Sequence, residues 1–220
     1  MVEAFYPGQF GGTAISSILY GLSPSGRLPY TIYDADFTTR RPDIGLIALQ
    51  FCKQILTLPY ISIGEMSLST NGGITYQYYE GKPLWPFGYG LSYTSFGLSW
   101  AAPSNLSGTS STLNQLSYGV NVVNTGAVVS DVSVLAYLTH QSTAAPGPLP
   151  RRELFAFCRI RDLHPGAPGK NCTLAVSATV VAHGGEVYSG DYAIAVELGD
   201  GTSLLGSLAV AALDISSHVV

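Results

Sequence analysis

The stretch Leu116-Ser117-Tyr118-Gly119-Val120-Asn121-Val122-Val123-Asn124-Thr125-Gly126 decides the fold of this chain. Its apolar side chains alternate at every second position up to Val122, which is the period of a β-strand with one buried face. Asn124-Thr125-Gly126 then supplies residue types that favour turns, because asparagine and glycine tolerate backbone conformations that other residues avoid. The stretch therefore predicts a strand that ends in a turn.

The same period of two continues through the second half of the chain. It predicts further strands over residues 132–138, 154–163, 172–180, 192–198 and 204–210. Turn sequences such as His164-Pro165-Gly166 and Gly199-Asp200-Gly201 separate some of these strands. About six or seven short strands at this spacing, over roughly a hundred residues, are typical of a β-sandwich. We therefore expect a mainly β protein.

The residues before the sandwich have a different pattern. Apolar residues recur with helical spacing from Ala14 to Leu19, with Thr13 as the expected N-cap and Gly21 as the residue that ends the helix. Residues 28–33 look extended. One short helix and one strand cannot enclose a core, so this block must pack on the rest of the chain or on another domain.

Composition limits the classes of partner. The chain has 220 residues, of which 46% are hydrophobic and 11% charged, with a net charge of −4 and no basic run. This balance argues against nucleic acid as a partner. The apolar run over residues 44–56 is interrupted by Gln50 and Lys53 and is shorter than the ~20 apolar residues of a membrane span, so we expect no membrane partner. The opening residues lack the pattern of a secretion signal.

The cysteines give no metal or cofactor site. Cys52, Cys158 and Cys172 have neither a paired spacing nor matching histidines, so we expect no metal and no other cofactor. Cys158 and Cys172 lie on strands that flank the His164-Pro165-Gly166 turn, and folding about that turn would make them cross-strand neighbours able to form a disulfide. The alternative is that both are buried small apolar residues.

Two sequences match the acceptor pattern for N-linked glycans. They are Asn105-Leu106-Ser107 and Asn171-Cys172-Thr173. Three-residue patterns of this kind also arise by chance, so ordinary polar residues in turns are the alternative.

The run Pro86-Phe87-Gly88-Tyr89-Gly90-Leu91-Ser92-Tyr93-Thr94-Ser95-Phe96 places aromatic residues between glycines. It resembles the segment that leads into the C-terminal fibronectin-III-like domain of family 3 glycoside hydrolases. Motifs similar to that family's follow in its order over most of the chain: Tyr6-Pro7-Gly8-Gln9, Ser25-Gly26-Arg27-Leu28-Pro29, Gly73-Ile74-Thr75-Tyr76, Val122-Val123-Asn124-Thr125-Gly126, Leu154-Phe155-Ala156-Phe157, Asp162-Leu163-His164-Pro165-Gly166 and Gly190-Asp191-Tyr192.

The resemblance implies a division of the chain. Residues 1–75 would be an incomplete remnant of the family's α/β-sandwich domain, with an atypical apolar insert near 45–65. Residues 76–105 would be an aromatic linker strap, and residues 106–215 a fibronectin-III-like, immunoglobulin-like β-sandwich. The Tyr6-Pro7-Gly8-Gln9 variant is similar to the β-xylosidase and α-arabinofuranosidase branch. Gln77 stands where the family usually has arginine, and Cys158 where it usually has glutamate.

The resemblance also implies that the chemistry lies elsewhere. Retaining glycosidases use two carboxylates about 5–5.5 Å apart, and in this family both lie in the barrel and α/β domain that precede this region. We therefore expect no catalytic residue here; the nearby pair Asp34 and Asp36 is better interpreted as charged loop residues. The chain would be the structural C-terminal portion of a secreted O-glycosyl hydrolase, with the missing barrel and α/β domain as its partners.

One alternative stays open at this point. The aromatic residues of the strap could stack on sugar rings, which would make the chain a secreted module that binds polysaccharide or a protein without catalysis. Packing between domains is the other interpretation of the same side chains, which are Tyr76, Tyr78, Tyr79, Trp85, Phe87, Tyr89 and Tyr93.

Overall fold

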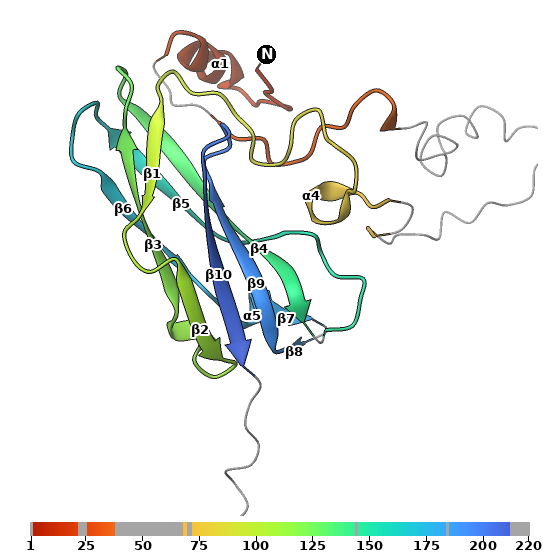
Figure 1. Cartoon of the computed structure of the whole chain (residues 1–220). Coiled ribbons are helices and arrows are strands. Elements are labelled where there is room, and N and C mark those ends of the chain that lie inside the picture. Colours follow the sequence, from red (N-terminus) through yellow and green to blue (C-terminus); the bar gives the residue numbers. More distant parts are fainter. Residues whose placement is uncertain are drawn as a thin grey trace, which may run out of the picture.

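Two β-sheets packed face to face form the main body of the protein (Figure 1). The computed structural model describes residues 2–21, 26–37, 68–69, 72–143, 145–183 and 185–211. The smaller sheet has the order β1-β3-β6 and contains β1 (Phe96–Trp100), β3 (Ser117–Asn124) and β6 (Lys170–Ala175). The larger has the order β2-β10-β9-β4-β5 and contains β2 (Asn105–Thr109), β10 (Ser203–Ala211), β9 (Gly190–Glu197), β4 (Ser130–Thr143) and β5 (Glu153–Leu163).

Neighbouring strands run antiparallel except at one edge, where β10 pairs with β2 in parallel. The remaining elements are short. They are α1 (Gly11–Leu19), α4 (Thr75–Tyr78), the 3₁₀ turn η1 (Leu113–Gln115), α5 (Ala178–Val181), and the strand pair β7 (Ala182–His183) and β8 (Glu186–Val187). The prediction of a mainly β fold is therefore confirmed.

The core lies between the two sheets and follows the alternation of the sequence. In β3, Tyr118, Val120 and Val122 are fully buried, and their neighbours face outward. In β9, Ile194 and Val196 contribute to the same core from the other sheet. Two apolar faces that bury each other in this way are the main stabilising contribution to a sandwich.

Strand β4 is buried on both faces. Val134, Ala136 and Leu138 point into the core, as the period of two predicts. Leu135 and Tyr137, which alternate with them, are also buried. The second layer therefore comes from residues outside the two sheets, on the outer face of the five-stranded sheet.

Three strand predictions need correction. β1 begins at Phe96 and pairs with β3, so the sheets include residues that the sequence division assigned to the strap. β6 ends at Ala175 rather than Val180, because Ser177 caps the short helix α5 by accepting a hydrogen bond from the backbone N–H of Thr179. β5 and β6 belong to different sheets, so the turn between them does not close a hairpin.

The helix predicted near residues 14–19 is present as α1, but the residue predicted to cap its N-terminus was wrong. α1 begins at Gly11 after Phe10, which makes no side-chain capping bond, and Thr13 lies inside the helix. Gly21 ends it as expected, with φ +73° and its N–H donated to the carbonyl of Ile18 at 3.1 Å. The helix α4 was not predicted, because four residues are too few to show a period.

Two sequence expectations lie outside the described residues: the apolar insert near 45–65, and Cys52. None of the helices in the described ranges has the length and apolarity needed to cross a membrane.

Candidate binding cleft

Residues 84–91, the crossing segment, pass over the outer face of the five-stranded sheet beside β4 (Figure 1). Gly88 lies at its centre with φ +81°, in the left-handed region that favours glycine. A Cβ on Gly88 would lie 2.5 Å from Cδ1 of Leu135 and 2.8 Å from the hydroxyl oxygen of Tyr137. The glycine therefore allows both the turn of the chain and its close approach to the sheet.

The extended residues 28–33 pair with this crossing segment. Leu28 donates its N–H to the carbonyl of Tyr89 at 2.9 Å, and Gly88 donates to the carbonyl of Leu28 at 2.8 Å. Ile32 and Trp85 exchange two further backbone hydrogen bonds of 2.8 and 3.1 Å. Residues 28–33 belong to the part of the chain before the strap, residues 1–75, which we call the front block. This part of the front block therefore packs on the rest of the chain, one of the two possibilities that the sequence left open.

Arg27 anchors the same segment to the end of β9. Its Nε donates to the carbonyl of Leu198 at 2.6 Å, and one terminal nitrogen donates to the hydroxyl of Ser92 at 3.3 Å. Burial lowers the pKa of the Arg27 guanidinium, and the charge of Asp200 opposes this shift. One side chain thus ties the front block, the strap and the β9–β10 turn together.

Several aromatic residues of the strap pack against other aromatic rings. Tyr76 and Phe87 are stacked with centroids 4.4 Å apart, and both meet the ring of Tyr137 edge-on at 6.1 and 6.4 Å. Tyr79 meets Tyr33 and Phe37 edge-on, and those two rings are stacked at 3.9 Å. Because these rings contact other rings of the chain, they indicate packing within the protein rather than an open platform on which sugars could stack.

Arg152 covers the ring of Tyr137. Its guanidinium carbon lies 3.6 Å from the ring centroid, and one terminal nitrogen lies 3.0 Å from Oε1 of Glu197. Burial raises the pKa of the Tyr137 phenol, and the positive charge of Arg152 opposes only part of this rise. Tyr137 therefore remains a hydrogen-bond donor at neutral pH.

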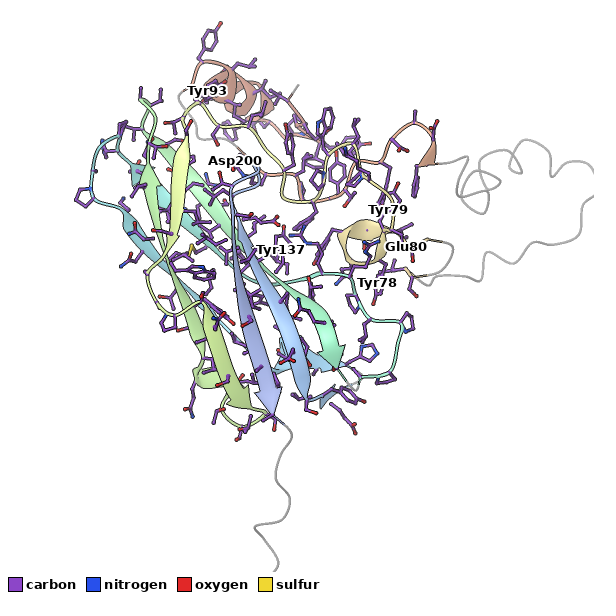
Figure 2. All side chains as sticks on the ribbon, viewed as in Figure 1. Tyr78, Tyr79, Glu80, Tyr93, Tyr137 and Asp200 are labelled. Atoms are coloured by element: carbon purple, nitrogen blue, oxygen red, sulfur yellow. A yellow bond between two sulfur atoms is a disulfide. The ribbon has the colours of Figure 1, made fainter. Side chains whose placement is uncertain are left out.

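A cleft of about 430 Å³ lies between this layer and the outer face of the sheet. Figure 2 shows Tyr137 on the sheet side of the cleft and Tyr79 near α4 on the other side. Its lining residues come from the front block, the strap, β4, β9 and the loop before β5: Thr31, Thr75, Tyr76, Tyr79, Pro83, Pro86, Phe87, Tyr137, Thr139, Arg151, Arg152, Ala195 and Glu197.

The two aspartates considered as a carboxylate pair lie outside this lining. The backbone carbonyl of Asp34 accepts a hydrogen bond from Phe37, and Asp36 is exposed in the same turn. The part of the chain that the structure describes contains no group of three histidine, cysteine or acidic side chains that could hold a metal.

Both glycosylation sequences lie on the surface. Asn105 begins β2 and Asn171 lies in β6, and each side chain is exposed. The Oδ1 of Asn105 accepts a hydrogen bond from the Ser207 hydroxyl at 2.9 Å, and that of Asn171 accepts one from Asn121 at 2.8 Å. The side-chain amide nitrogen of each residue, to which a glycan would be attached, takes no part in these two hydrogen bonds. The residues lie in strands and not in turns.

Cys158 and Cys172 form a disulfide in the structure, with their Cα atoms 6.5 Å apart. The bond joins β5 of one sheet to β6 of the other. The expectation that the two are neighbours in one hairpin was therefore wrong, although their proximity is as expected. The pair lies at the edges of both sheets, where it links the layers of the sandwich.

Sequence reasoning missed two arginines that organise this region. Arg27 was noted only as part of a motif. Arg152 drew no attention, since nothing in the local pattern shows that it will lie over Tyr137. The available signal was that each arginine is a charged residue in a chain with few charges, which could have indicated a specific role.

Comparisons with known proteins agree with the motifs. Residues 1–93 match the family model described as the glycosyl hydrolase family 3 C-terminal domain. A probable exo-1,4-β-xylosidase of Aspergillus clavatus, bxlB, is 33% identical over 91% of this chain and 26% of its own length. An exo-1,4-β-xylosidase of Aspergillus oryzae, xlnD, is 31% identical over 93% of this chain. The chain thus spans about a quarter of the length of these relatives.

Solved structures give the same relationship. A family 3 exo-β-xylosidase, XlnD, in complex with a xylobiose aziridine probe superposes with a TM-score of 0.72 at 27% identity, over 94% of this chain and 27% of that one. The β-D-glucoside glucohydrolase of Trichoderma reesei gives a TM-score of 0.63 at 25% identity, over 93% and 29%. Sequence, motif order and fold therefore place this chain in glycoside hydrolase family 3, in the C-terminal region of that family.

Proposed function

We propose that this chain is the C-terminal structural portion of a family 3 glycoside hydrolase of the β-xylosidase type, and that it braces the catalytic domains without carrying out hydrolysis. The observation that carries the proposal is an apolar surface on the front block and the adjoining part of the strap. Its members are exposed large side chains: Val2, Phe5, Tyr6, Phe10, Leu19, Tyr20, Leu91 and Tyr93.

Little of the described part of the chain covers this surface. Tyr6 is fully exposed, and Phe10 and Tyr20 are 75% and 82% exposed. Among the described residues, a hydrogen bond of 2.7 Å from the hydroxyl of Tyr93 to the carbonyl of Ile18 joins α1 to the strap. Large apolar side chains that gather in one exposed region often mark an interaction site. An α/β domain and barrel, of the kind that the longer relatives have room for, would cover it.

The catalytic inactivity of this chain follows from the family chemistry. Hydrolysis with retention needs a nucleophile and an acid/base carboxylate on opposite sides of the glycosidic bond. In the family that the chain resembles, both lie in the barrel and the α/β domain, so we expect neither of them in this chain. We expect the parent reaction to be hydrolysis of terminal β-linked sugars, with xylose the sugar suggested by the names of the relatives.

An assay on aryl glycosides tests this. The purified chain should release no phenol above the buffer rate from aryl β-xylosides, β-glucosides or α-arabinofuranosides. The Asp34→Asn variant is the matched control, since Asp34 and Asp36 form the best local carboxylate pair. Turnover that co-purifies with the chain and disappears in Asp34→Asn would overturn the proposal.

We also propose that the intact protein is secreted, with glycans on Asn105 and Asn171. The disulfide between Cys158 and Cys172 supports this, because such bonds persist in oxidising compartments. Expression through a secretory pathway should give a mass that falls on enzymatic deglycosylation and is lower in Asn105→Gln and Asn171→Gln variants.

The second candidate is a module that binds polysaccharide or protein without catalysis. Sedimentation with insoluble xylan and cellulose separates the two functions. A chain that only supports the catalytic domains remains in the supernatant, whereas a polysaccharide-binding module moves to the pellet. The mutual stacking of Tyr76 and Phe87 favours the brace, because it leaves no broad aromatic platform for a long chain.

A further inference from the structure

We infer that the cleft beside β4 binds a single sugar unit or a disaccharide. The inference goes beyond the proposed function, because a brace needs no such site and an inactive chain can still have one. It rests on the size of the cleft, the chemistry of its walls and two buried hydroxyl groups in those walls.

The size and the walls match a sugar ring. The cleft measures about 430 Å³, at the lower end of the ~300–1,000 Å³ range of small-molecule sites. Apolar surface comes from Pro83 and Pro86, on which the C–H face of a pyranose can pack. Hydroxyl groups of Thr75 and Thr139 lie among these apolar groups. Apolar faces mixed with hydrogen-bonding groups are complementary to a ring that carries hydroxyls on its edge.

Two hydroxyls in the walls of the cleft are buried and unpaired. Among the described residues, Oγ1 of Thr31 and the hydroxyl of Tyr137 have no hydrogen-bond partner. Thr31 is 9% exposed and Tyr137 is 1% exposed, and they belong to different walls of the cleft. Buried polar groups are nearly always paired, so two such groups at one cleft indicate a hydrogen-bonding occupant.

The charged groups favour a neutral or weakly acidic sugar. Arg152 and Glu197 neutralise each other at 3.0 Å, and Arg152 is held over Tyr137. Arg151 is different, because its backbone N–H is fixed by the carbonyl of Gln77 while its side chain is exposed at the cleft. The fork of a guanidinium can donate to two neighbouring hydroxyls at once, as on adjacent carbons of a sugar. A fully apolar occupant would leave these donors unpaired.

Ligand-observed and protein-observed NMR titrations of the chain with xylose, xylobiose and glucose test the inference. At least one of these sugars should bind saturably with Kd on the order of 1 mM, as suits a small ligand with few anchoring groups. Shifts should map to residues around Thr139 and Ala195. The absence of saturable binding by all three sugars at tens of times that concentration would overturn the inference.

Two variants locate the site. Arg151→Ala should weaken binding about tenfold, the cost of one hydrogen bond to a charged group. Its matched control is Arg161→Ala, an exposed arginine on β5 outside the cleft lining, which should leave the affinity unchanged. Equal affinity in the Arg151→Ala and Arg161→Ala variants would show that the sugar binds elsewhere and would contradict the assignment.

Tyr137→Phe separates binding from stability. The substitution keeps the ring beneath Arg152 and removes only the unpaired hydroxyl, so the thermal midpoint without sugar should not fall. Binding should weaken, and the rise in midpoint on adding sugar should be lost. Tyr118→Phe is the control, because its hydroxyl donates to the carbonyl of Ser207 at 2.7 Å and its removal should lower the midpoint. Unchanged sugar affinity in Tyr137→Phe would exclude the hydroxyl from the site.

Discussion

Asn124 shows how one side chain can join several parts of the fold. It is 4% exposed, and its amide nitrogen donates to the carbonyls of Val128 and Leu163, both at 2.8 Å. Its Oδ1 accepts from the hydroxyl of Thr94 at 2.7 Å and from the N–H of Gly126 at 3.1 Å. The strap, the β3–β4 turn and the end of β5 therefore meet at a single amide group.

Replacing this amide should be costly. Asn124→Ala leaves buried donors and acceptors without partners, and we expect the free energy of unfolding to fall by about 2–4 kcal/mol. Urea unfolding measures the change. Asn121→Ala is the matched control on the same strand, since Asn121 makes its bond to Asn171 on the surface and should change stability by less than about 0.5 kcal/mol. Equal losses in the two variants would contradict this role for Asn124.

The sequence could predict that Asn124 lies in a turn, but not that it is a buried clamp. Its turn propensity is a local property of Asn124-Thr125-Gly126. Its partners Thr94 and Leu163 are distant in sequence, and only the folded arrangement brings them to it. The same reason explains why Arg152 was missed. Local patterns report which way a residue faces along a strand, and they contain no information on what covers the outer side.

At the scale of elements, the alternating pattern predicted strands well and their partners poorly. It located β3, β4, β9 and β10 within a few residues. It missed β1 although Phe96, Leu98 and Trp100 alternate there, because the family resemblance had assigned these residues to the strap. It also implied a β5–β6 hairpin, whereas β6 crosses to the other sheet. A period of two shows which face is buried and does not show which sheet a strand joins.

The docking of the crossing segment on the sheet can be tested at Gly88. Gly88→Ala introduces a Cβ at φ +81° against Leu135 and Tyr137, and we expect a loss of about 2–4 kcal/mol in unfolding free energy. Gly166→Ala is the matched control, because Gly166 has φ +69° with open space around its Cβ position and should lose only about 1 kcal/mol. A smaller loss at Gly88 than at Gly166 would show that the close approach is unimportant.

The link between the sheets can be tested at the disulfide. Cys158 and Cys172 are 14 residues apart in sequence, and closing a loop of this size is expected to stabilise the fold by about 3 kcal/mol through the unfolded state. A Cys158→Ala, Cys172→Ala double variant should therefore unfold at lower urea, and added reductant should lower the midpoint of the wild-type chain only. Peptide mapping without reductant that finds both thiols free would contradict the bond.

At the scale of the whole molecule, the two halves of the chain differ in what supports them. The sandwich has a closed core and a disulfide between its sheets. Residues 26–33 are held by Arg27 and by pairing with the crossing segment. Within the described residues, the hydrogen bond from Tyr93 to Ile18 joins α1 to the strap, and apolar side chains such as Leu19 are exposed. Residues 26–33 are therefore held more firmly than α1.

Native-state hydrogen exchange of the monomeric chain tests the central claim, that the sandwich supports itself while the front surface is made to be covered by the rest of an enzyme. Amides of β3 and β9 should exchange only through global unfolding, and those of Leu28, Ile32 and Trp85 through a partial opening of lower free energy. Amides of α1, such as those of Ala14 and Ile18, should exchange at nearly the rate of an unfolded chain. Protection of α1 equal to that of β9 in a monomer would show that the front block is complete without a partner, and would contradict the account.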